Sequence, residues 1–174
     1  MRKAITLIEH PYLSIHLDYD YLTVGEIGNL LIRLQALLRS LAELSRGGRE
    51  QPRFIVKSIQ GQNSTDLVIM LSILTVAASI PQHATLYRET AAKTFRQFKL
   101  LTLAATAERG LKTTVTRGEI DPALARQALE ELSPKQRKKL NNFLRALTKP
   151  AHGVVIGDEE TEISLSRTDL PKLL

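Results

Sequence analysis

The sequence predicts an α+β fold, in which an antiparallel sheet of about four to six strands carries a long amphipathic helix, a helical region and a C-terminal β-hairpin. Three observations predict it. Short β-rich runs flank one leucine-rich helix in a β-β-α-β-β order within residues 1–80. Three helical segments, two of them initiated by proline, occupy about residues 85–149, and two apolar runs around a turn signal fill residues 153–166. We expect a single domain, residues 1–174, because this length suffices to bury a core.

Two short runs near the N-terminus have the composition of strands. "AITLIEH" (residues 4–10) and "LSIHLDY" (residues 13–19) both show rough apolar alternation. Pro11 lies between them and marks a turn. The sequence therefore predicts a strand pair, or a strand and an edge piece, before the long helix.

The clearest element is a helix over about residues 23–46. Thr23 and Glu26 have the spacing of a capping box, and the two glycines at 47 and 48 end the helix. Its apolar side chains recur every three or four residues, and the stripe is wide: Ile27, Leu30, Leu31, Leu34, Leu37, Leu38, Leu41 and Leu44. One whole face must therefore be buried, either on the sheet of the same chain or against a second copy.

The same 3-4 spacing is that of a coiled-coil seam. The predicted self-association residues are Leu30, Leu34, Leu37 and Leu41.

A hairpin is predicted after the long helix. "RFIVKSI" (residues 53–59) alternates, "GQNS" (residues 61–64) is a turn signal, and residues 66–73 form a strand buried on both faces. The apolar run that continues to Pro81 is shorter than the roughly 20 apolar residues that a membrane-spanning helix needs, so a core element is favoured. "LTVAASIP" (residues 74–81) fits either the end of this strand or a helical turn.

Three further helices and a final hairpin are predicted in the second half. One covers about residues 86–110. The next two begin at an N-cap residue followed by proline, at Asp121-Pro122 and at Ser133-Pro134. In "GVVIGDEETEISL" (residues 153–165), apolar alternation on both sides of a Gly-Asp turn predicts the β-hairpin.

Positive charge is concentrated in the helical region. Residues 88–149 hold 14 Lys or Arg against 6 Asp or Glu, within a net charge of +6 for the chain. Such a patch can bind phosphates, and in "KTFRQFK" an exposed phenylalanine could also stack on a base. The alternative is that Phe95 and Phe98 belong to the core and that the cations form a solvated face. The predicted nucleic-acid contacts are Lys93, Arg96, Lys99, Lys135, Arg137, Lys138 and Lys139.

No catalytic, cofactor or metal site is predicted. The chain has no cysteine, which excludes thiolate metal sites and a cysteine nucleophile and fits a cytoplasmic location. His16, Asp18 and Asp20 could gather a metal or an acid/base pair, but a solvated strand end is the favoured interpretation. The acidic turn at Asp158–Glu162 is likewise expected to be a solvated hairpin tip. Phosphate-loop, zinc-protease and nucleophile-elbow motifs are absent, and no small-molecule substrate is evident.

These observations together favour a non-catalytic, self-associating binding or scaffold protein of a bacterial-type cytosol, acting as a homo-oligomer or with a protein partner. The first alternative is a nucleic-acid-binding protein that uses the basic helical region. Further alternatives are a membrane-acting effector that uses the apolar segment 67–80, and an enzyme whose site has no sequence signature.

Overall fold

The computed structural model describes most of the chain, and for residues 43–46, 53–60, 64–72 and 81–87 it describes the backbone alone. The described ranges are residues 11–19, 23–46, 53–60, 64–72, 81–108, 113–148 and 153–165. The predictions made for residues 4–10, for Asp20, for the glycines at 47 and 48, for the turn at 61–63 and for residues 73–80 lie outside them.

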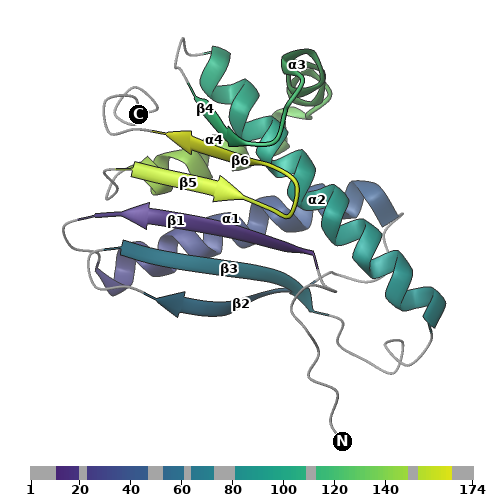
Figure 1. Ribbon diagram of the computed structural model, residues 1–174, viewed down its shortest axis with the longest axis horizontal. Helices are drawn as coiled ribbons and strands as arrows, with labels where there is room; N and C mark the ends of the chain where they lie inside the picture. The colour runs from purple at the N-terminus through teal and green to yellow at the C-terminus, as the bar shows by residue number, and fades with distance from the viewer. Residues whose placement is uncertain are drawn as a thin grey trace, which may run out of the picture.

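Within these ranges the chain forms an α+β fold, which confirms the predicted class (Figure 1). The helices are α1 (Val24–Arg46), α2 (Pro81–Glu108), α3 (Pro122–Glu130) and α4 (Pro134–Thr148). The strands are β1 (Tyr12–Asp18), β2 (Arg53–Gln60), β3 (Ser64–Ser72), β4 (Thr114–Arg117), β5 (Gly153–Gly157) and β6 (Glu162–Leu165).

The six strands form one sheet in the order β2-β3-β1-β5-β6-β4, and every neighbouring pair is antiparallel. The two predicted hairpins, β2–β3 and β5–β6, are both present, and β1 joins them. Ile15 in the middle of β1 lies opposite Leu67 of β3 on one side and Ile156 of β5 on the other. Strand β3, which corresponds to the strand predicted after "GQNS", lies between β2 and β1 and is paired on both edges.

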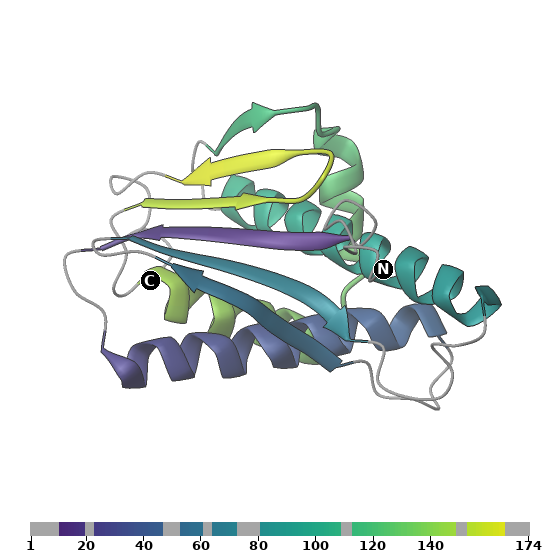
Figure 2. The same ribbon diagram turned by 60° about the horizontal axis from the view of Figure 1, so that its bottom comes forward.

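The helices cover one face of the sheet. Figure 1 looks onto the uncovered face, and Figure 2 shows the strands and the helices as two layers. Burial alternates along β1, β5 and β6 as this arrangement requires, because successive side chains point to opposite faces. The buried apolar side chains of these strands are Leu13, Ile15, Leu17, Val154, Ile156, Ile163 and Leu165.

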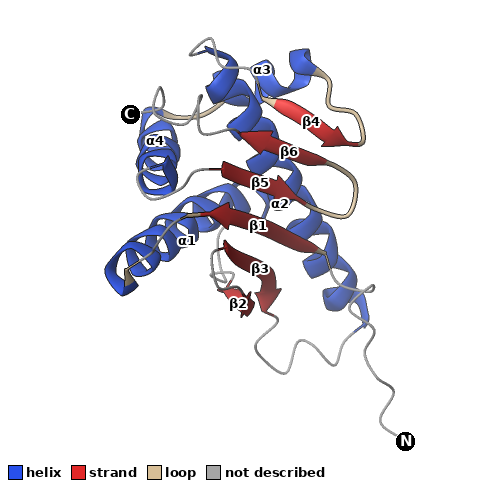
Figure 3. Ribbon diagram, turned by 60° about the vertical axis from the view of Figure 1, so that its left-hand side comes forward, coloured by secondary structure: helices blue, strands red, loops and turns tan. Residues whose placement is uncertain are grey.

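Helix α1 is covered from two sides within its own chain. It packs on the sheet and also contacts α2 and α4, which lie beside it in the helical layer (Figure 3). Leu38 is fully buried and Leu31 packs against the core as a partly buried side chain. The leucine stripe is wide because helices as well as strands cover it.

This packing corrects the predicted self-association seam. The four predicted residues Leu30, Leu34, Leu37 and Leu41 are each at most 1% exposed in the single chain. Side chains that already lie in the core have no surface to offer a second copy. The seam prediction is therefore wrong for these residues, and their stripe marks the intramolecular core.

The three helix starts that were predicted from capping residues, those of α1, α3 and α4, are confirmed by their hydrogen bonds. At α1 the Thr23 amide donates to Glu26 Oε2 over 2.9 Å, and the Glu26 amide donates to Thr23 Oγ1 over 3.1 Å, a complete capping box. Asp121 accepts from the Ala123 amide at the start of α3. Ser133 and Gln136 cap α4 reciprocally at 3.0 and 3.2 Å. Local sequence thus sets where these helices begin.

Two elements differ from the sequence prediction. Helix α2 begins at Pro81 rather than near Leu86, since a proline is accommodated in the first helical turn, where its missing N–H has no partner. Strand β4, only four residues long, lies in a segment where no strand is predicted. Its pairing with β6 defines it as a strand, since it is too short to show an alternation of apolar and polar residues.

Both edge strands of the sheet are irregular. The β2–β3 register shifts between Val56 and Ser58, and the β4–β6 register shifts between Val115 and Arg117. Bulges at edge strands interrupt the row of free backbone groups that would otherwise pair with another chain. Growth of this sheet by edge-to-edge pairing is thereby disfavoured.

The buried stripe can be tested with a leucine and an isoleucine from the same helix. We expect Leu37→Ala to lower the free energy of unfolding by about 2–5 kcal/mol, because Leu37 is fully buried. Ile32→Ala, at a position 66% exposed, should change it by less than about 0.5 kcal/mol. Urea denaturation measures both, and equal effects at the two positions would contradict the assignment of α1 to the core.

Candidate functional site

The seven predicted nucleic-acid contacts lie on two helices and differ in accessibility. Lys93, Arg96 and Lys99 are on α2, whereas Lys135, Arg137, Lys138 and Lys139 are on α4. Lys93 and Arg96 are exposed, but Lys99 is only 1% exposed. Lys99 therefore has to be removed from the predicted set, since a buried ammonium group cannot reach a phosphate.

Lys99 instead forms a buried ion pair with Asp158. Its Nζ lies 2.5 Å from Asp158 Oδ1, and the two side chains are 2% and 11% exposed. The Lys99 ammonium also donates to the hydroxyl oxygen of Thr161 and, over 3.3 Å, to its carbonyl oxygen. Burial lowers the pKa of Lys99 from its ordinary value, while the hydrogen bond and the charge of Asp158 act in the opposite direction.

The partner of Lys99 overturns part of another prediction. The acidic turn was expected to be solvated, and Glu159 and Glu160 are indeed exposed. Asp158, however, is buried and shapes the β5–β6 loop, which we define as residues 158–161. Its Oδ1 accepts the amides of Glu160 and Thr161 over 2.8 and 2.9 Å. One carboxylate thus both closes the turn and neutralises Lys99.

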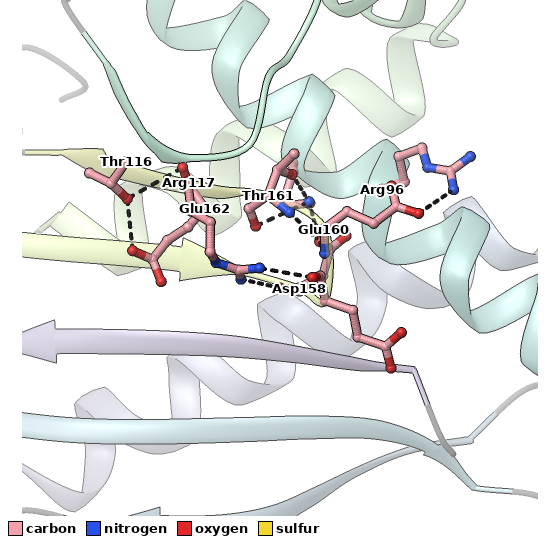
Figure 4. Close-up of polar contacts among 9 residues, drawn as sticks. Arg96, Thr116, Arg117, Asp158, Glu160, Thr161 and Glu162 are labelled. Atoms are coloured by element: carbon pink, nitrogen blue, oxygen red, sulfur yellow. Dashed lines mark hydrogen bonds and ion pairs between the residues drawn. The ribbon is translucent and has the colours of Figure 1, made fainter. Parts of the chain in front are cut away.

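Two arginines hold the same loop from other elements (Figure 4). Arg117 of β4 donates to the carbonyl oxygen of Glu159 over 2.8 Å and to that of Asp158. Arg96 of α2 lies 3.3 Å from Glu160 in an exposed ion pair. The β5–β6 loop is therefore bound to both α2 and β4, and Arg96 already has a carboxylate partner.

The turn after β4 also packs tightly on this loop. Gly118 has a φ of +73°, and a Cβ at this position would lie 2.5 Å from the Glu160 carbonyl oxygen. Only glycine fits such a backbone conformation with a neighbour this close. The chain can enter α3 close against the β5–β6 loop because residue 118 has no side chain.

Helix α4 carries the accessible cations. Lys135 and Lys138 are exposed and Lys139 is partly exposed, and none of them forms an ion pair with a described carboxylate. Arg137 differs, because it donates to the Leu129 carbonyl oxygen over 3.1 Å and lies 3.8 Å from Glu108. Exposed Arg145 extends the basic character toward the end of the helix.

We define the α4 basic face as the solvent-facing side of this helix. It includes no acidic residue, because α4 contains none. Its opposite side is apolar and buried, as Leu140, Phe143, Leu144 and Leu147 are at most 1% exposed. The members of the α4 basic face are Lys135, Lys138, Lys139, Asn142 and Arg145.

The phenylalanines of "KTFRQFK" do not reach solvent. Phe95 and Phe98 are 1% and 0% exposed, and Phe98 packs edge to face on Phe143 of α4 with ring centroids 5.3 Å apart. Both rings belong to the core, and the Phe98–Phe143 contact links α2 to α4. Stacking of a base on these rings is therefore excluded in this structure.

His16 and Asp18 form a hydrogen-bonded pair on β1, with His16 Nε2 3.0 Å from Asp18 Oδ1. Asp18 is exposed, and Asp20 lies outside the described residues. No group of three or more metal-ligating side chains occurs among the residues that the structure describes. We assign no catalytic or metal-binding role to this pair.

A cavity of about 160 Å³ lies between α2 and α3. Its walls are mainly apolar, with Leu103, Ala104, Ala125 and Leu129, and they also include Glu108 and Arg126. This volume is below the ~300–1,000 Å³ of typical ligand and cofactor pockets. We therefore assign no cofactor to it.

Comparison with protein-family models, with curated proteins and with solved structures gives no match to this chain. Within the described ranges, no helix has the length and the apolar composition needed to cross a membrane. Residues 67–72 of the apolar segment belong to β3, inside the sheet.

The buried ion pair can be tested by removing one charge and then both. We expect Lys99→Met to lower the free energy of unfolding by about 3–5 kcal/mol, because it leaves the buried Asp158 carboxylate without its counter-charge. Adding Asp158→Asn should restore part of the loss, since the asparagine oxygen can still accept the loop amides. Urea denaturation of the single and double variants gives both values.

The control is the exposed pair next to it. Arg96→Gln removes the contact with Glu160 and should cost less than about 1 kcal/mol. A Lys99→Met variant no less stable than Arg96→Gln would show that the buried pair does not hold the loop.

Gly118 provides a second stability test. We expect Gly118→Ala to destabilise the fold by about 1–3 kcal/mol, because of its positive φ and the close carbonyl of Glu160. Gly28→Ala in α1 is the matched control, since nothing lies within 4 Å of its added Cβ, and it should stabilise the helix by up to about 1 kcal/mol. Thermal unfolding distinguishes the two signs, and a neutral Gly118→Ala would refute the tight contact.

Proposed function

We propose that this protein is a nucleic-acid-binding protein and that the α4 basic face is its contact surface. The observation that carries the proposal is the placement of Lys135, Lys138 and Lys139 on one helix face without described carboxylate partners. Arrays of lysine and arginine on one face bind the phosphates of nucleic acids.

The arrangement is unfavourable for the helix itself. Lys135 lies three residues before Lys138 and four before Lys139, and like charges at these spacings repel. Lys135 also lies in the first turn of α4, where the helix dipole disfavours positive charge. Binding of a ligand of opposite charge would account for a cluster that lowers the stability of its own helix, because function is often gained at a cost in stability.

The other surfaces support self-association less well. The leucines predicted for that role are buried, and both edges of the sheet are interrupted by bulges. The three cations of "KTFRQFK" offer little surface for binding. Lys93 is exposed, but Arg96 is paired with Glu160 and Lys99 is buried. Among these contact surfaces, the α4 basic face is the one with several accessible cations and no described carboxylate partner for its lysines.

Reversing one charge of the α4 basic face should change stability and binding in opposite directions. We expect Lys135→Glu to raise the free energy of unfolding by up to about 1 kcal/mol, because it places an acid in the first turn, four residues before Lys139. The same variant should weaken nucleic-acid binding by roughly tenfold at low salt. Urea denaturation and filter binding with a labelled duplex and a labelled single strand measure the two effects.

Arg88→Glu is the matched control, with the same change of charge at an exposed position on α2. It should weaken binding much less than Lys135→Glu. Equal losses for the two variants would mean that only the net charge matters, and binding unchanged by Lys135→Glu would sink the assignment to α4.

A further inference from the structure

The α4 basic face carries cationic side chains and one side-chain amide but no aromatic side chain. Its side-chain chemistry is that of three lysines, one arginine and Asn142, while the only aromatic residue of the helix, Phe143, is fully buried. Proteins that bind single strands without sequence preference stack successive bases on exposed aromatic side chains. The α4 basic face contains no such platform.

The two phenylalanines of "KTFRQFK" are also unavailable for stacking. Phe98 packs against Phe143 inside the core, and Phe95 is 1% exposed. Turning the Phe98 ring outward would remove its contact with Phe143 of α4. Contacts from this face are therefore limited to charge and hydrogen bonding.

The geometry of the face suits a rigid, densely charged partner. Lys135 and Arg145 are ten residues apart on one helix, which corresponds to about 15 Å along its axis. A duplex carries one phosphate charge per ~1.7 Å of axis, so a rod of this length lies beside several phosphates at once. A flexible single strand has a lower charge density and gains most from the stacking that this face lacks.

We infer that the partner is double-helical nucleic acid, held through its phosphates and not through stacked bases. This inference rests on the proposed function, and it names the substrate class of the same surface.

The test compares the binding of a 20-base-pair duplex, which is about two helical turns long, with the binding of a single strand of equal length. The full chain is titrated onto each labelled nucleic acid, and fluorescence anisotropy measures binding at several salt concentrations. We expect the duplex to bind at least about tenfold more tightly. Its log K should fall with log salt at a slope of about −3 to −4, as four phosphate contacts require. Lys135→Glu should reduce that slope by about one.

The outcomes separate the two proposals. A single strand that binds as tightly as the duplex, with Lys135→Glu weakening both, overturns the inference and leaves the proposed function standing. Failure of both probes to bind, or binding that Lys135→Glu leaves unchanged, overturns the proposed function itself. A duplex preference with a slope near zero also contradicts the inference, because phosphate contacts must release counterions.

Discussion

The buried ion pair between Lys99 and Asp158 is the constraint on which the arrangement of the second half of the chain depends. It joins the middle of α2 to the loop of the β5–β6 hairpin. Arg117 binds the same loop from β4, and Gly118 lets the following turn lie against it. Because β4 leads into α3 and α3 into α4, this cluster helps to fix where the α4 basic face points.

The cations of the helical region fall into two groups: those with a described carboxylate neighbour and those without one. Lys99 is neutralised by Asp158, Arg96 by Glu160, and Arg137 lies near Glu108. Each of these contacts links a helix to another element, so these residues serve the fold. The lysines of α4 have no such described partner, and their mutual repulsion opposes folding. Lysine therefore has a structural role at position 99 of α2, whereas for the lysines of α4 we propose a binding role.

The sequence predicted what depends on neighbours along the chain and missed what depends on neighbours in space. Capping residues such as Thr23 and Ser133 act within one turn, so their helix starts could be read directly. The leucine period of α1 indicated burial, yet a period cannot say whether strands, helices or a second copy provide the cover. For Lys99 a signal existed, since it lies four residues after buried Phe95 on the same helix face. Its partner, 59 residues further on, and the short strand β4 arise only from tertiary packing.

Chemical-shift mapping tests most directly whether α4 is the binding surface. A ¹⁵N-labelled sample is titrated with a short duplex while the backbone amides of all elements are followed. We expect the shifts to concentrate in α4, around Lys135, Lys138 and Asn142, and to leave the uncovered face of β1 and β6 unchanged. Shifts centred on the sheet face, or none in α4 at saturation, would contradict the assignment.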